Sequence, residues 1–123
     1  MQAVTLGTLS VRGERSVLNL RRKLLVVAQY VGVNSGKAAQ LAASTSDYAK
    51  EASRRGPLAV TVKVTGLTQF DAICVEFSST HPGDERWLSL GFDHIEPLNN
   101  GEKCGWRAWC NTAPRRRSAE TTQ

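Results

Sequence analysis

The spacing of the apolar residues changes at Gly56 and Pro57, and this change constrains the fold more than any other feature of the sequence. Between residues 17 and 52, apolar side chains recur every three or four positions, which is the repeat of an amphipathic helix. Between residues 58 and 77, two segments alternate apolar and polar side chains, which is the repeat of a half-buried strand. A chain with this pattern packs a helical layer against a sheet.

Two helices are predicted before the change in spacing. The first begins at Glu14 and ends before Gly32, and the second begins after a cap at Asn34 or Ser35 and ends before Gly56. The expected buried face of the first helix consists of Val17, Leu20, Leu24, Val27 or Ala28, and Val31. That of the second consists of Ala38, Leu41, Ala42, Thr45, Tyr48, Ala49 and Ala52.

Strands are predicted around the helical region, at residues 3–11, 58–64, 70–77, 92–98 and 104–112. Residues 78–85 form a polar connection that includes Pro82 and Gly83, and Asn99-Asn100-Gly101 is a turn signal within a hairpin. The order strand, helix, helix, strand, strand, loop, strand, strand predicts an α+β fold. We expect a two-layer sandwich with the helices on one face of a mixed β-sheet.

The length of 123 residues fits one domain, which we place at residues 1–112 and follow with a flexible basic tail at residues 113–123. No apolar run approaches the roughly 20 residues of a membrane span, and residues 1–11 lack a signal-peptide pattern. We therefore expect a cytoplasmic protein that does not associate with a membrane. The three cysteines are expected to be reduced, and His81, His94, Cys104 and Cys110 lack the tight spacing of a zinc site.

The net charge of +5 is unevenly distributed along the chain. Residues 1–57 carry nine Lys or Arg against three acids, whereas residues 58–112 carry four against seven. Such an excess favours acidic partners, whether protein or nucleic acid. Solvated helix faces that aid solubility are the simpler explanation of the same pattern.

Three segments resemble the anti-sigma factor and switch-protein serine kinases of the histidine-kinase-like (GHKL) ATPase superfamily. Residues 41–51, LAASTSDYAKE, are similar to the family helix LATAVSELARN. Residues 75–83, VEFSSTHPG, are similar to V-x-V-x-D-x-G-P-G, and residues 92–96 with Gly101 and residues 105–107 are similar to F-x-I-x-S-x-P-G-x-G-T. The resemblance spans most of residues 14–112 and implies a shortened histidine-kinase-like ATPase fold.

The resemblance also implies a nucleotide site with ATP and Mg²⁺ as cofactors. Asp47 stands at the family's catalytic carboxylate, and Glu51 replaces the asparagine that holds Mg²⁺. Ser79 replaces the aspartate that binds adenine, His81 replaces a loop glycine, and Gly83 is retained. The structural alternative is that Asp47 and Glu51 are solvent-facing residues that pair with nearby cations.

The departures from the family pattern indicate a degenerate member. Glu51 adds negative charge beside phosphates, and the Cβ atom of His81 narrows the base pocket. Eight residues separate Gly83 from Phe92, where the family has a much longer nucleotide lid, and residues 88–91 are interpreted as its remnant. Kinase chemistry depends on positioning and charge stabilisation that a lid supplies.

The sequence therefore favours a regulatory protein that binds a sigma factor, an anti-anti-sigma factor or a related switch protein, with impaired or absent nucleotide use. An ATP-binding serine/threonine kinase acting on an anti-sigma-factor antagonist is the first alternative, so enzyme activity stays open. A basic nucleic-acid-binding domain, using Arg12, Arg15, residues 21–23 and residues 115–117, is the second. A homodimer is a further open alternative.

Overall fold

The computed structural model describes residues 2–66, 70–81, 83–101 and 103–111, so the predicted tail lies outside the described residues. The elements in chain order are β1 (Gln2–Val11), α1 (Glu14–Val31), α2 (Ser35–Ser53), β2 (Leu58–Gly66), β3 (Phe70–Ser79), the short 3-10 helix η1 (Glu85–Trp87), β4 (His94–Asn100) and β5 (Lys103–Asn111). The two predicted helices and five predicted strands are confirmed. Among the described helices, none is long and apolar enough to cross a membrane.

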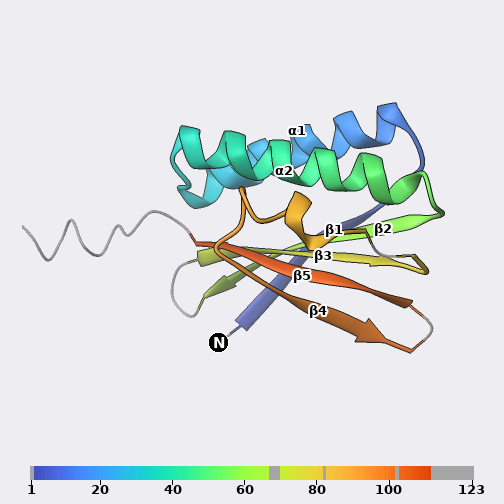
Figure 1. Ribbon diagram of the computed structural model, residues 1–123. Coiled ribbons are helices and arrows are strands. Elements are labelled where there is room, and N and C mark those ends of the chain that lie inside the picture. The colour runs from blue at the N-terminus through green and yellow to red at the C-terminus, as the bar shows by residue number, and fades with distance from the viewer. Residues whose placement is uncertain (1, 67–69, 82, 102, 112–123) are drawn as a thin grey trace, which may run out of the picture.

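The strands form one sheet in the order β1-β2-β3-β5-β4, and both long helices lie on the same face of it (Figure 1). This confirms the two-layer α+β sandwich. The expectation of a mixed sheet is wrong, because all four strand pairs are antiparallel. The connection from β1 to β2 explains why the β1–β2 pair is antiparallel. Its two helices, of 18 and 19 residues, run in opposite directions, so the chain returns to the end of the sheet where β1 finished.

The turn between the helices is formed by the residues that the sequence indicates. Gly32 ends α1 in the left-handed region at φ 92°, and its N–H donates a hydrogen bond to the carbonyl of Ala28. Asn34 caps α2, because its side-chain oxygen accepts a hydrogen bond from the backbone N–H of Lys37 at 2.8 Å. Of the two predicted caps, Asn34 is therefore the one used.

The core lies between the helical layer and the covered face of the sheet. Every side chain predicted to be buried on the two helices is buried. Alternate residues of the central strands face them, among them Val60 and Val62 of β2 and Val75 and Phe77 of β3. Apolar burial of this kind supplies most of the stability of a small domain.

Charged side chains cross the uncovered face of the sheet in a row. Lys63 of β2 approaches Glu76 of β3 at 3.2 Å, and Arg107 of β5 donates a hydrogen bond to the same carboxylate at 2.8 Å. Arg107 also reaches Glu96 of β4 at 3.2 Å. The hydrogen bond with Glu76 is the main cause that raises the pKa of Arg107. This row, Lys63-Glu76-Arg107-Glu96, has no net charge, and it lies on the face that none of the described helices covers.

The segment after Gly83 packs into the core instead of looping outward. Leu88 is fully buried and belongs to the core cluster, and Phe92 packs edge-on against Phe77 with ring centroids 6.4 Å apart. A Cβ atom on Gly91 would lie 2.6 Å from the carbonyl oxygen of Gln40, so only glycine lets the chain pass this close to α2. The residues interpreted as a lid remnant thus seal the edge of the core.

Leu88→Ala is expected to lower the free energy of unfolding by about 2–5 kcal/mol, because it leaves a cavity at a fully buried site. Leu90→Ala, at a side chain that is 81% exposed two residues away, is the matched control and should change it by less than about 0.5 kcal/mol. Urea denaturation of both variants measures the difference. Equal losses would contradict the burial of this segment.

Candidate functional site

The residues that the resemblance assigns to a nucleotide lie on the C-terminal half of α2 and on the connection after β3. Asp47 is exposed on α2, and Glu51, one turn later, is partly buried. Ser79 is buried at the end of β3, whereas His81 is exposed. In the described part of the chain, no hydrogen bond or ion pair joins either helix carboxylate to this connection.

Tyr48, which lies between the two carboxylates in sequence, is the residue that joins α2 to the connection. Its hydroxyl accepts a hydrogen bond from the backbone N–H of Gly83 at 3.2 Å. The carbonyl of Gly83 accepts a second hydrogen bond, from the indole N–H of Trp106 on β5, at 2.9 Å. Both backbone groups of Gly83 are therefore engaged inside the fold, and its N–H is not free to donate to a phosphate.

Packing against Tyr48 can explain why residue 83 is a glycine. A Cβ atom on Gly83 would lie 3.3 Å from Cε1 of Tyr48, which is tighter than most real contacts. The Tyr48 ring in turn packs on Phe77, with ring centroids 4.8 Å apart. Close packing on an aromatic ring thus favours glycine at this position, because a larger residue would have to displace the Tyr48 ring by a few tenths of an ångström.

Ser79 and His81 interact with each other and with their immediate neighbour. The Ser79 hydroxyl accepts a hydrogen bond from the backbone N–H of His81 at 3.2 Å, which is a local turn contact. Nδ1 of His81 lies 3.0 Å from the hydroxyl of Thr80. One acceptor position of the Ser79 hydroxyl is therefore used by the backbone of its own turn.

Glu51 lies 3.7 Å from Arg54, a cation on the next turn of α2, whereas Asp47 has no hydrogen-bond or ion-pair partner among the described residues. Mg²⁺ sites in proteins combine carboxylates with other oxygen ligands. In the described ranges, no three His, Cys, Asp or Glu side chains gather as a zinc site would require, so the four zinc candidates are not brought together. A Mg²⁺ ion at Glu51 would instead take most of its ligands from water and from nucleotide phosphates.

Cys74, Cys104 and Cys110 are free in the structure. Burial raises the pKa of the Cys74 thiol to about 11 and has the same effect on Cys110. Both thiols are therefore protonated at neutral pH, and a protonated thiol is a poor nucleophile and metal ligand.

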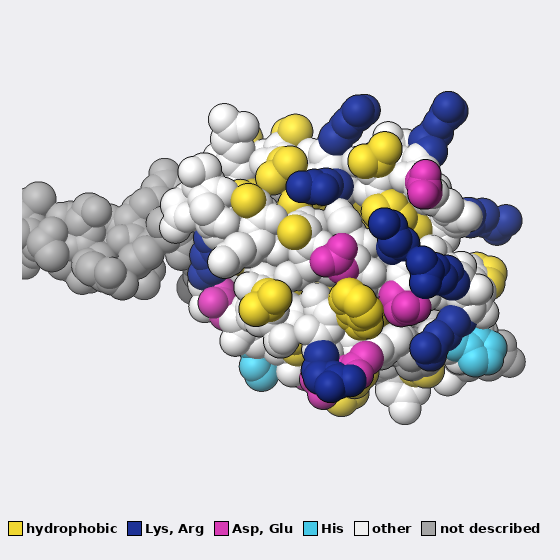
Figure 2. Space-filling model, turned by 45° about the horizontal axis from the view of Figure 1, so that its top comes forward, with side chains coloured by type: hydrophobic (Ala, Val, Ile, Leu, Met, Phe, Trp, Pro, Cys, Tyr) yellow, Lys and Arg dark blue, Asp and Glu magenta, His cyan; other side chains and the backbone are white. Residues whose placement is uncertain are grey.

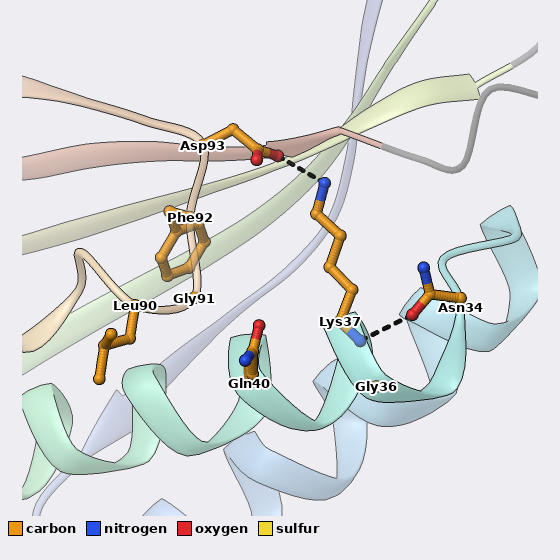
Figure 3. Close-up of a pocket in the computed structure, with 8 residues that line it drawn as sticks. All are labelled: Asn34, Gly36, Lys37, Gln40, Leu90, Gly91, Phe92 and Asp93. Atoms are coloured by element: carbon orange, nitrogen blue, oxygen red, sulfur yellow. Dashed lines mark hydrogen bonds and ion pairs between the residues drawn. The ribbon is translucent and has the colours of Figure 1, made fainter.

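A cavity of about 340 Å³ lies at the other end of α2, where sequence reasoning placed no site (Figure 3). It is lined by Asn34, Gly36, Lys37, Gln40, Leu90, Gly91, Phe92 and Asp93. The ammonium group of Lys37 lies 2.8 Å from the Asp93 carboxylate, and this carboxylate also accepts a hydrogen bond from the backbone N–H of Asn111 at 2.7 Å. The charged groups of the cavity are thus paired with each other, and they tie α2 to the sheet.

No protein-family model matches the chain, and no curated protein is similar to it. The resemblance to the serine kinases therefore depends on the three motifs and on the order of the elements.

Tyr48→Phe is expected to lower the free energy of unfolding by about 1–3 kcal/mol, because it leaves the buried N–H of Gly83 without an acceptor. Tyr30→Phe removes the same hydroxyl from a side chain that is exposed on α1, and it serves as the matched control. Thermal and urea unfolding compare the two variants. The contact would be unimportant if both variants matched the wild type.

Asp93→Asn is expected to reduce stability at pH 7 and to make it less sensitive to acid. Burial opposes ionisation of Asp93, but the hydrogen bonds from Lys37 and the Asn111 amide outweigh it and lower the pKa of this carboxyl. A group whose pKa is lowered by folding stabilises the protein above its unfolded-state pKa, about 3.9 for Asp, and loses this effect as pH falls through the folded-state value.

The stability difference between wild type and Asp93→Asn should therefore shrink as pH falls below about 4. Urea denaturation between pH 7 and pH 2 measures it. Asp47→Asn, at a carboxylate without a described partner, is the control and should stay within about 0.5 kcal/mol of wild type at pH 7. A difference that is constant over this range would exclude the ionised Asp93 as its cause.

Proposed function

We propose that this chain is a regulatory domain that acts by binding another protein and does not use nucleotide. In this proposal, it is a degenerate, histidine-kinase-like scaffold that resembles the anti-sigma factor serine kinases. Its partner is a sigma factor, an anti-anti-sigma factor or a related switch protein. The observation that carries the proposal is the engagement of both backbone groups of Gly83 by Tyr48 and Trp106.

Nucleotide phosphates are bound mainly by free backbone N–H groups, by cations and by a metal ion. At the positions matched to the family, the amide of Gly83 donates to Tyr48 and the amide of His81 donates to Ser79. The short segment that replaces the lid buries Leu88 in the core. These contacts support a scaffold that is complete without a ligand.

The helical layer supports the binding role. It presents large hydrophobic side chains to solvent, together with Lys and Arg (Figure 2). Exposed apolar side chains that gather on one element are typical of protein interaction sites. A domain with a closed core and an exposed apolar helix is suited to docking rather than to catalysis.

The ATP-dependent serine kinase is the alternative against which this proposal is tested. It would require Asp47 to orient the reacting groups and Glu51 to hold Mg²⁺ beside the phosphates. Asp47 is exposed and has no partner in the described chain, so it is the feature that favours the alternative. The Glu51–Arg54 contact would have to open.

Calorimetric titration of the full chain with ATP and ADP, with and without Mg²⁺, distinguishes the two functions. We expect no heat of binding and no shift in melting temperature at millimolar nucleotide. The Glu51→Ala variant is the control for specific metal-dependent binding. Binding that requires Mg²⁺ and disappears in Glu51→Ala would overturn the proposal and restore the kinase.

A further inference from the structure

The outward face of α1 exposes more apolar surface than a helix packed on a sheet requires. Eight large hydrophobic side chains are exposed in the described chain, and four of them belong to α1: Leu18, Leu25, Val26 and Tyr30. Leu18 is 51% exposed and Leu25 is 37% exposed. Single exposed hydrophobic residues are ordinary, but half of the total on one element is a concentration that calls for a partner.

The two leucines form a line along the helix with arginines on both sides. Leu18 and Leu25 are seven residues apart, so they lie two turns apart on nearly the same side of α1. Arg21 and Arg22 follow Leu18 by three and four residues, which places one on each side of this line. We call these four residues the α1 stripe. Val26 and Tyr30 extend the exposed apolar surface toward the C-terminal end of the helix.

The cations of the α1 stripe are exposed arginines without an ion-pair partner in the described chain, as are Arg12, Arg15 and Arg55. Arg54 has Glu51 as an ion-pair partner, and Arg86 has Asp84. For Arg21 and Arg22, in contrast, the described residues supply neither a side-chain hydrogen bond nor an ion pair. Figure 2 shows the same mixture, with hydrophobic side chains beside Lys and Arg over the helical layer. Carboxylates from outside the chain would complete this surface.

We propose that the α1 stripe is a docking surface for an amphipathic helix of a partner protein, with an apolar side bordered by Asp or Glu. This inference rests on the proposed function and names the chemistry of its partner. Apolar residues of the incoming helix would cover Leu18 and Leu25, and its carboxylates would pair with Arg21 and Arg22. The 18 residues of α1 span about 27 Å, which offers about five turns for packing helix on helix.

Charge complementarity favours a protein helix over a lipid surface or a nucleic acid. Leucines lie at the centre of the stripe, where a nucleic acid would require cations for its phosphates. The planar guanidinium groups of Arg21 and Arg22 match carboxylates in a bidentate geometry. The opposite side of α1 is buried in the core, so the helix cannot turn its whole apolar surface toward a bilayer.

The probe is a fluorescent helical peptide of about 18 residues, with Leu at heptad positions a and d and Glu at e and g. A second peptide with Lys at e and g is the matched probe. Fluorescence anisotropy with the full chain is expected to show binding of the acidic peptide that weakens as salt rises, and no binding of the basic peptide. Failure of the acidic peptide to bind at millimolar protein, or equal binding of both peptides, would overturn the proposal.

Surface variants locate the binding site. Leu18→Ser with Leu25→Ser, and separately Arg21→Glu with Arg22→Glu, should each weaken binding of the acidic peptide by about tenfold or more. Leu90→Ser and Lys50→Glu are the matched controls, because both side chains are exposed outside α1, and they should bind as wild type does. Circular dichroism verifies that all variants fold. Unchanged binding in both stripe variants would show that the surface is wrong.

Two further outcomes separate this inference from the proposed function and from a lipid surface. Specific Mg²⁺-ATP binding together with stripe-dependent binding of the acidic peptide would overturn the proposed function and leave the stripe intact. If no nucleotide binds and the stripe variants still bind the acidic peptide as wild type does, the proposed function stands and the stripe is overturned. If the chain cosediments with phosphatidylserine vesicles and does not bind the peptide, the stripe binds an anionic membrane. This result would overturn the proposal of a protein partner.

Discussion

The hydrogen bonds at Gly83 connect three parts of the fold that are far apart in the sequence. Tyr48 of α2 accepts from its N–H, and Trp106 of β5 donates to its carbonyl. Burial raises the pKa of the Tyr48 hydroxyl, so it remains protonated while it accepts this bond. The connection between β3 and η1 is thereby fixed against both layers, and Leu88 follows it into the core. The closed edge of the sandwich depends on this small set of polar contacts, because backbone groups at a buried position must be paired.

Local patterns predicted the elements, because helix and strand periodicity depend on neighbouring residues. The helical faces, the Asn34 cap and the Gly32 stop are all encoded within a few positions. Strand direction is different, since it follows from how the chain returns after two helices, and the expected mixed sheet was wrong for that reason. The burial of Leu88 and the Lys37–Asp93 ion pair were also missed, because residues 84–93 show no sustained period and ion-pair partners distant in sequence leave no local signal.

The candidate nucleotide residues show that a sequence motif does not by itself reveal why each of its residues is present. A glycine that is retained for a ligand and a glycine that is retained for packing are identical in sequence, and Gly83 packs on Tyr48. In the same way, the sequence does not show what a serine in place of the aspartate binds. In the structure, the Ser79 hydroxyl accepts a hydrogen bond from the backbone N–H of His81. Asp47 and Glu51 remain positions whose roles follow from the resemblance, and the described contacts of Glu51 involve Arg54 on its own helix.

The two faces of the sandwich differ in how their charges are arranged, and this difference has a physical consequence for association. On the uncovered face of the sheet, Lys63, Glu76, Arg107 and Glu96 alternate in sign and pair across four strands, so a charged partner would have to break existing contacts before it gained new ones. On α1, Arg21 and Arg22 have no such partners in the described chain and lie beside exposed leucines. A partner that brings carboxylates and apolar groups together gains both interactions there without that cost. The helical layer is therefore the side on which an acidic protein would be held.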